Sequence, residues 1–177
     1  MSSSPADPLI TPRLRLLPCD AEVARAAVEA PERLSDLLGL PVDPAWPSED
    51  LLEVLPAWAD ALALDPALRR WGLFLVIERR SGGLVGDVGF KGAPDERGAV
   101  EIGYGIVPDF QGRGYATEAV GAIVAWARRH PEAREIRAAC YASNLASRRV
   151  LEKSGFRHVA TDGGVLDWSL PLVRPRP

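Results

Sequence analysis

The stretch from Val100 to Ala127, V-E-I-G-Y-G-I-V-P-D-F-Q-G-R-G-Y-A-T-E-A-V-G-A-I-V-A-W-A, decides the fold. Up to Ile106, apolar residues alternate with Glu101 and glycines, which is the period of a β-strand. Pro108 cannot donate a hydrogen bond to a sheet, so we expect the strand to end before it. Beyond the turn at 111–116, apolar residues recur at helical spacing. The stretch therefore predicts a strand, a glycine-rich turn and a helix in direct succession.

The chemistry that this turn suits is anion binding. The first turn of a helix has unpaired backbone N–H groups and the positive end of the helix dipole. Gly112 and Gly114 have no Cβ, so a ligand can approach the main chain closely, and a positive φ is accessible to them. Arg113 adds a full positive charge. Together these features predict a pyrophosphate-binding turn.

Two common nucleotide-binding patterns do not fit this turn. The P-loop requires a lysine directly after its last glycine, and no lysine stands in that register. The dinucleotide fingerprint requires a third glycine, but Thr117 stands there.

A third pattern, [QR]-x-x-G-x-[GA], fits Gln111–Ala116, and a second signature, N-x-x-S-x-x-x-x-E-K-x-G-F, fits Asn144–Phe156. The two signatures stand about thirty residues apart, each in the expected strand–helix context. With them the chain resembles the GNAT superfamily of N-acyltransferases. The pairing of the E-I-G-Y run before the turn with the second signature points to its RimJ/RimL-like branch. The resemblance covers roughly the last hundred residues well and the N-terminal part loosely.

Composition bounds the remaining function classes. With 177 residues, we expect one domain over 1–177 with a proper core. The net charge is −3 and the basic residues are dispersed, which argues against nucleic-acid binding. There is no apolar run of membrane-spanning length and no secretory signal, so we expect a cytoplasmic protein that does not bind membranes. Cys19 and Cys140 lack metal-ligand spacing, so no metal is expected.

The rest of the chain predicts a mixed sheet of about seven strands with helices on both faces, in the α/β (α+β) class. Residues 1–8 are expected to be disordered, as is the C-terminal R-P-R-P. Pro56 is expected to kink or interrupt a helix that begins after Ser48. The expected strands are 9–17, 71–79, 84–91, 100–107, 136–141, 156–161 and 165–170. The other expected helices are 20–30, 32–38, 115–130 and 144–154.

The resemblance implies how acetyl-CoA would bind. The parallel strands at 100–107 and 136–141 would splay apart, and the thioester arm of the cofactor would lie in the gap. Unpaired main chain at Ile106 and Val107 would bind the pantetheine amides, and a backbone N–H there would stabilise the oxyanion. The full set of residues expected to bind the cofactor is Ile106, Val107, Gln111, Gly112, Arg113, Gly114, Tyr115, Ala116, Thr117, Asn144, Ser147 and Arg148.

Two side chains are the candidates for proton transfer, Glu101 as the base and Ser147 on the thiol side. Glu101 also has a purely structural interpretation, as a partner across the sheet, and the two interpretations carry equal weight. Ser147 shares a helix face with Asn144. Both could instead belong only to the start of the helix, with Asn144 as its N-cap. The general-acid tyrosine that the superfamily often uses is absent from this helix.

The acceptor pocket is predicted to contain Trp46, Tyr104 and Trp168, although both tryptophans suit the core equally well. The resemblance implies an enzyme that transfers acetyl from acetyl-CoA to a primary amine, on a protein N-terminus or a small molecule. The alternative is an acyl-CoA-binding or sensing module that has lost the chemistry. The resemblance also allows a homodimer, which nothing in the composition requires.

Overall fold

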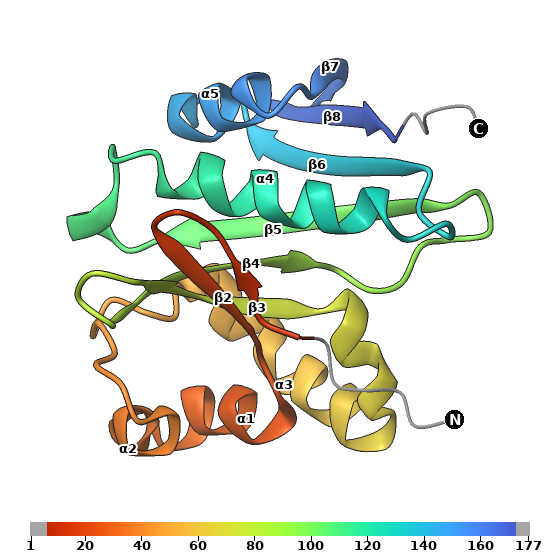
Figure 1. Ribbon diagram of the computed structural model, residues 1–177. Helices are drawn as coiled ribbons and strands as arrows, with labels where there is room; N and C mark the ends of the chain where they lie inside the picture. The colour runs from red at the N-terminus through yellow and green to blue at the C-terminus, as the bar shows by residue number, and fades with distance from the viewer. Residues whose placement is uncertain (1–6, 173–177) are drawn as a thin grey trace.

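The computed structural model describes residues 7–172, which form a mixed α/β domain around an eight-stranded sheet (Figure 1). The strand order is β1-β2-β3-β4-β5-β6-β8-β7. The strands are β1 (Leu9–Ile10), β2 (Leu14–Pro18), β3 (Leu73–Glu78), β4 (Leu84–Phe90), β5 (Ala99–Ile106), β6 (Glu135–Tyr141), β7 (Arg157–Asp162) and β8 (Val165–Pro171). The helices are α1 (Ala21–Glu29), α2 (Leu34–Leu38), α3 (Glu49–Leu64), α4 (Tyr115–Arg128) and α5 (Leu145–Lys153), with 3-10 turns η1 (Pro31–Arg33), η2 (Pro66–Trp71) and η3 (Pro108–Phe110).

The sequence predicted one strand over 9–17, whereas the structure has two, and this accounts for the eighth strand. The break is a turn around Pro12. The Thr11 N–H donates to the carbonyl of Leu14 at 2.9 Å, and the Thr11 hydroxyl accepts from the Leu14 N–H at 3.0 Å. These bonds fold the chain back on itself, so β1 pairs antiparallel with β2 instead of continuing it.

The helices of the N-terminal half begin at the caps that the sequence predicted. The Asp20 carboxylate accepts from the Val23 N–H at 2.9 Å, and the Ser48 hydroxyl accepts from the Leu51 N–H at 3.3 Å. Of the two outcomes expected at Pro56, an interruption was wrong, because α3 continues through this residue to Leu64. The later residues of α3 pack in the core, and this packing stabilises the whole helix.

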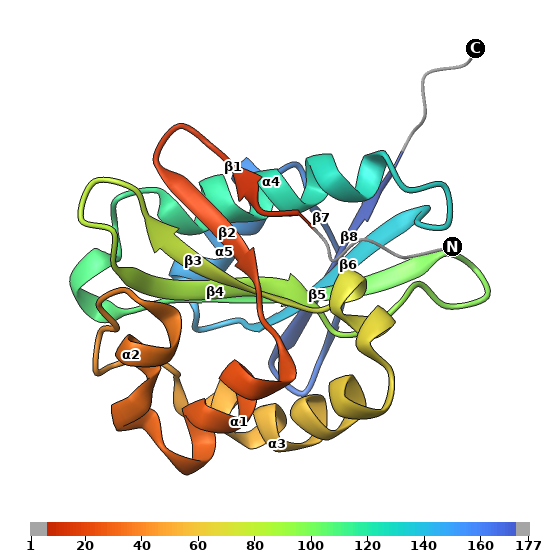
Figure 2. The ribbon, with the colours of Figure 1, turned by 60° about the horizontal axis from the view of Figure 1, so that its bottom comes forward.

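The sheet separates two layers of helices (Figure 2). On one face lies α4, with Trp126 packed against Phe90 of β4 at 5.4 Å between ring centroids. On the other face lie α1, α2 and α3. Because side chains alternate along a strand, even-numbered residues of β5 such as Ile102 share the α4 face with Phe90. The odd-numbered residues of β5 face the α1/α3 side.

The predicted splay between the two parallel strands is confirmed. β5 pairs with β6 only from Ala99↔Glu135 to Glu101↔Arg137, although β6 continues to Tyr141. Farther along, β5 pairs with β4 alone, up to Gly86↔Ile106. A gap therefore opens between β5 and β6 beyond Glu101, and β5 leads through η3 and the glycine-rich turn into α4 at this end of the strand.

Several expectations about the termini concern residues outside the described part of the chain. Most of the segment expected to be disordered, residues 1–6, lies there, as does the C-terminal R-P-R-P. Among the residues that the structure describes, no helix combines the length and apolar character needed to span a membrane.

Candidate active site

The turn before α4 has backbone N–H groups that are free to donate hydrogen bonds to a ligand. Gly112 and Gly114 adopt positive φ angles of 72° and 80°, and Gly114 is the N-cap of α4. The first backbone bond of the helix runs from the Glu118 N–H to the carbonyl of Gly114 at 3.1 Å. Within residues 7–172, the backbone N–H groups of Gly114, Tyr115, Ala116 and Thr117 have no acceptor. Four donors at the positive end of a helix can bind an anion.

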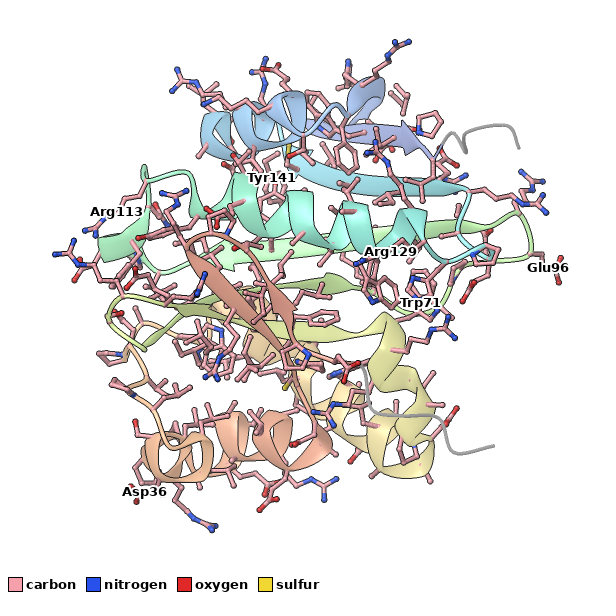
Figure 3. All side chains as sticks on the ribbon, viewed as in Figure 1. Asp36, Trp71, Glu96, Arg113, Arg129 and Tyr141 are labelled. Atoms are coloured by element: carbon pink, nitrogen blue, oxygen red, sulfur yellow. The ribbon has the colours of Figure 1, made fainter. Side chains whose placement is uncertain are left out.

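The polar side chains of the turn shape it by binding its own main chain. The Gln111 side-chain amide donates to the carbonyl of Ile106 at 2.8 Å, and Arg113 donates to the carbonyl of Asp109 at 2.8 Å. The Arg113 guanidinium also lies over the ring of Phe110, 5.0 Å from its centroid. Arg113 is nevertheless exposed, at the outer edge of the molecule beside the start of α4 (Figure 3). The Arg113 side chain therefore stays in solvent, and its positive charge adds to the electrostatic potential at the turn.

Arg13, which the sequence analysis missed, ties the turn to the N-terminal strands. Its guanidinium donates to the carbonyl of Arg113 at 2.8 Å, pairs with Glu118 at 2.7 Å and lies over the ring of Tyr115. Burial raises the pKa of Glu118, but hydrogen bonds from Thr11 and Arg13 outweigh it and hold the pKa below its usual range. Glu118 is therefore an ionised anchor for Arg13. The buried Tyr115 ring leaves only main chain to face a ligand.

The main chain of β5 presents alternate residues to the gap. The Lys91 N–H donates to the Glu101 carbonyl at 2.8 Å, and the Val107 N–H donates to the Val85 carbonyl at 3.0 Å. In an antiparallel ladder this alternation turns the odd-numbered residues of β5 toward β4. The even-numbered Tyr104 and Ile106 therefore present their N–H groups to the gap.

The prediction of unpaired main chain at Val107 was wrong. Its N–H binds Val85, and its carbonyl accepts from the Phe110 N–H at 3.0 Å. The reason is that β4 continues alongside the end of β5 and that the 3-10 turn η3 begins directly after it. Ile106 keeps its predicted place, although its carbonyl is already bound by Gln111.

The start of α5 meets β5 through Tyr104. The Asn144 side chain accepts from the Ser147 N–H at 3.0 Å, which makes Asn144 the N-cap of the helix. The Tyr104 hydroxyl donates to the carbonyl of Ser147 at 3.2 Å, and burial raises the pKa of Tyr104 to about 12. The Ser147 hydroxyl itself has no partner within residues 7–172. Arg148 donates to the carbonyl of Ala142 at 3.3 Å, so it helps to hold the start of α5.

Glu101 lies on the α1/α3 face, opposite in direction to Tyr104. Its carboxylate forms an ion pair with Lys91 of the adjacent chain segment, and both side chains are about half exposed. Glu101 and Ser147 therefore stand on the two sides of β5, one toward the α1/α3 layer and one toward α5. The carboxylate and the hydroxyl therefore lie on opposite faces of the sheet.

The structure does not bring the three predicted pocket residues together. Trp168 pairs with Ala138 of β6, which lies on the α4 face with Ile136 and Val100. Trp46 lies on the other face, where its indole Nε1–H donates to Asp87 at 3.0 Å. Both tryptophans are buried, and Tyr104 lies at the gap on the α4 face of β5. The sequence analysis did not single out Asp87, which stands in the otherwise apolar and glycine-rich run of β4.

Two hollows lie elsewhere on the molecule. One of about 340 Å³ lies over α1 and extends to Leu37, and one of about 310 Å³ lies between Leu17, Leu75 and Arg69. Neither is lined by residues of the turn or the gap. In the described part of the chain, no group of three or more His, Cys, Asp or Glu side chains is arranged to hold a metal ion.

Comparison with known proteins assigns the family. The model of the acetyltransferase (GNAT) domain family matches residues 13–157. The chain is 31% identical over 148 residues to the uncharacterised N-acetyltransferase YjdG of Bacillus subtilis, covering 84% of this chain and 88% of that one. It is 35% identical to YoaA of the same organism over 89 residues, which is 50% of this chain and 48% of YoaA.

Solved structures agree on the fold. A ribosomal-protein-S5-alanine acetyltransferase from Vibrio fischeri superposes with a TM-score of 0.68 at 18% identity, over 97% of this chain and 100% of that one. The ribosomal-protein acetyltransferase RimL, in complex with coenzyme A, gives 0.66 at 18% identity, over 93% and 98%. At these identities the likeness concerns the fold alone. The family match over most of the chain goes further, and it shows that the chain belongs to the GNAT acetyltransferase family.

Proposed function

We propose that the chain transfers an acetyl group from acetyl-CoA to a primary amine by direct attack within a ternary complex. The observation that carries this proposal is the row of backbone N–H groups from Gly114 to Thr117 without acceptors, beside the gap between β5 and β6. The N–H groups would bind the pyrophosphate, as helix N-termini bind anions. The gap would hold the pantetheine arm, with the N–H groups of Tyr104 and Ile106 as donors. RimL and MccE, both similar in fold, are known in complex with coenzyme A and acetyl-CoA respectively.

The chain's own residues suggest a division of roles. Glu101 faces the α1/α3 side, where it would take a proton from the amine directly or through water. An N–H group of the gap would donate to the thioester oxygen as negative charge develops on it. Ser147, with a free hydroxyl on the other side of β5, would supply a proton to the departing thiolate. Gly112, Arg113, Ala116, Asn144 and Arg148 would support the cofactor around these groups.

One observation favours the alternative of an acyl-CoA-binding module. Glu101 is ion-paired with Lys91, so a base in this position must first leave its partner. A protein that only binds acyl-CoA would keep the turn before α4 and the gap, and Glu101 would then be structural. Under the enzymatic proposal, the acceptor would be a protein N-terminal amine or a small-molecule amine. Under the alternative, there would be no acceptor.

Turnover of two variants separates these functions. We expect Glu101→Gln and Ser147→Ala each to lower the rate of thiol release from acetyl-CoA by more than about tenfold, which is roughly 1.4 kcal/mol in the barrier. The assay would use phenethylamine, spermidine and a dipeptide amide with a free N-terminus as acceptors. Glu132→Gln is the matched control, because Glu132 is also a half-exposed carboxylate in an ion pair, with Arg70. Rates within about tenfold of wild type for both variants would refute the assigned roles.

A further inference from the structure

Asp87 is a buried carboxyl group for which the described structure offers no cation. Its side chain is only 7% exposed, and one oxygen, Oδ2, accepts from the indole N–H of Trp46 at 3.0 Å. Within residues 7–172, no lysine or arginine forms an ion pair with it, and its other oxygen has no hydrogen-bond partner. Buried carboxylates are normally paired or bonded by several donors. Asp87 therefore has unused capacity for a cationic donor.

The position of Asp87 in the sheet would bring a cationic donor close to the gap between β5 and β6. Asp87 pairs across the sheet with Gly105 of β5, one residue before Ile106. A Cβ built on Gly105 would meet only the two carboxylate oxygens of Asp87 within 4 Å, at 3.7 and 4.0 Å. A Cβ on Gly103 would meet only the Lys91 side chain, at 3.7 Å. The α1/α3 face of β5 thus has a strip without side chains, with Asp87 at one end.

We propose that Asp87 is the group that binds the acceptor amine, as a primary ammonium ion lying over Gly105, with Trp46 holding the carboxylate in place. This rests on the proposed function, since it is the acceptor side of the same site. The indole N–H of Trp46 donates its hydrogen bond to Oδ2 of Asp87. Oδ1 is therefore left to accept a hydrogen bond from the ammonium group. The bare strip admits a primary ammonium on a slender chain, whereas a quaternary ammonium lacks the N–H that Oδ1 would accept.

Charge accounts for the choice of ligand. Burial raises the pKa of Asp87 to about 7, and the hydrogen bond from Trp46 lowers it only in part. The ionised form is therefore poorly compensated in the free protein, and an ammonium ion supplies the missing opposite charge. Glu101 stands four residues from Gly105 on the same face of β5, about 13 Å along the strand, so it would take the proton of the bound ammonium through a chain of waters. Glu101 is already paired with Lys91. Asp87 is thus the less compensated of the two carboxylates on this strip.

The kinetic test removes the charge and keeps the shape. Asp87→Asn retains an oxygen that can accept from Trp46. The assay uses the acceptor amine that gives the wild-type protein its highest kcat/KM. For this amine, we expect the KM of Asp87→Asn to be about tenfold or more above the wild-type KM. The Kd for acetyl-CoA should stay within about twofold, because Asp87 contributes nothing to the cofactor turn. Glu78→Gln is the matched control, since Glu78 is the other buried acidic side chain among the described residues. An unchanged KM in Asp87→Asn would overturn the proposal.

A binding test decides the proposal even if no amine in the panel is acetylated. The indole N–H signal of Trp46 in a ¹⁵N spectrum, assigned through Trp46→Phe, reports directly on the bond to Asp87. We expect methylammonium chloride to shift this signal saturably in the wild type and not in Asp87→Asn. Tetramethylammonium chloride at equal ionic strength should not shift it. A shift that is absent from the wild type, or equal in both proteins, would overturn the proposal. Failure of acetyl-CoA to bind would instead refute the proposed function alone.

Discussion

Replacing Gly114 with valine is expected to weaken acetyl-CoA binding by roughly a hundredfold or more, as measured by isothermal titration. Gly114 has a φ of 80° and its N–H is the first of the four unpaired donors before and within α4. A β-branched residue there must either adopt a left-handed conformation, at about 1–2 kcal/mol, or move the main chain. Its Cβ would also lie 3.4 Å from the Arg13 guanidinium, which holds the turn.

The control for this variant should carry the same backbone strain at a distance from the turn. Gly39 ends α2 with a φ of 65°, and a Cβ built on it would meet nothing within 4 Å. Gly39→Val should therefore lose similar folding stability and keep the wild-type affinity for acetyl-CoA. If Gly114→Val binds acetyl-CoA as tightly as Gly39→Val does, the turn before α4 is not the pyrophosphate site.

Removing the carboxyl group of Asp87 is expected to stabilise the fold at alkaline pH. Its pKa is raised from 3.8 to about 7 by burial, so the unfolded chain ionises first as the pH rises. The stability from this group is fully present below pH 3.8 and is lost as the pH rises to about 7. The stability advantage of Asp87→Asn should therefore grow by up to about 4 kcal/mol between about pH 4 and pH 8.

Urea unfolding of Asp87→Asn and wild type at each pH measures this difference. Glu78→Gln should show the opposite sign, because the hydrogen bond with Ser81 lowers the pKa of Glu78. Its carboxylate stabilises the fold above the unfolded pKa, and that contribution disappears as the pH falls. If the difference between Asp87→Asn and wild type does not change with pH, Asp87 is not a poorly compensated buried carboxyl group.

The part of the site built from local sequence was predictable. The turn at 111–116, the helix after it and the cap at Asn144 each follow from residues that are neighbours in the chain. The splay came from the resemblance to a known family. The resemblance also suggested Val107, but whether a strand residue is unpaired depends on the register of its neighbour, and β4 bonds Val107 through Val85.

The proposed acceptor side could not be predicted, because it depends on which face of the sheet each residue occupies. Trp46 and Trp168 are equally apolar in sequence, yet register places them on opposite faces. The structure shows that Asp87 is buried beside Gly105 of β5, a contact between two strands that the sequence does not reveal. Arg13 likewise meets Arg113 only through folding. One signal was available in the sequence, since an aspartate within an apolar strand requires a partner.

Isothermal titration of the unmodified protein with acetyl-CoA, CoA and NADH tests the central claim most directly. The claim is that the turn before α4 and the gap between β5 and β6 bind an acyl-CoA. It predicts saturable one-to-one binding of acetyl-CoA and of CoA, and no binding of NADH at the same concentrations. A well-folded protein that binds neither acetyl-CoA nor CoA, or that binds NADH equally well, would contradict it.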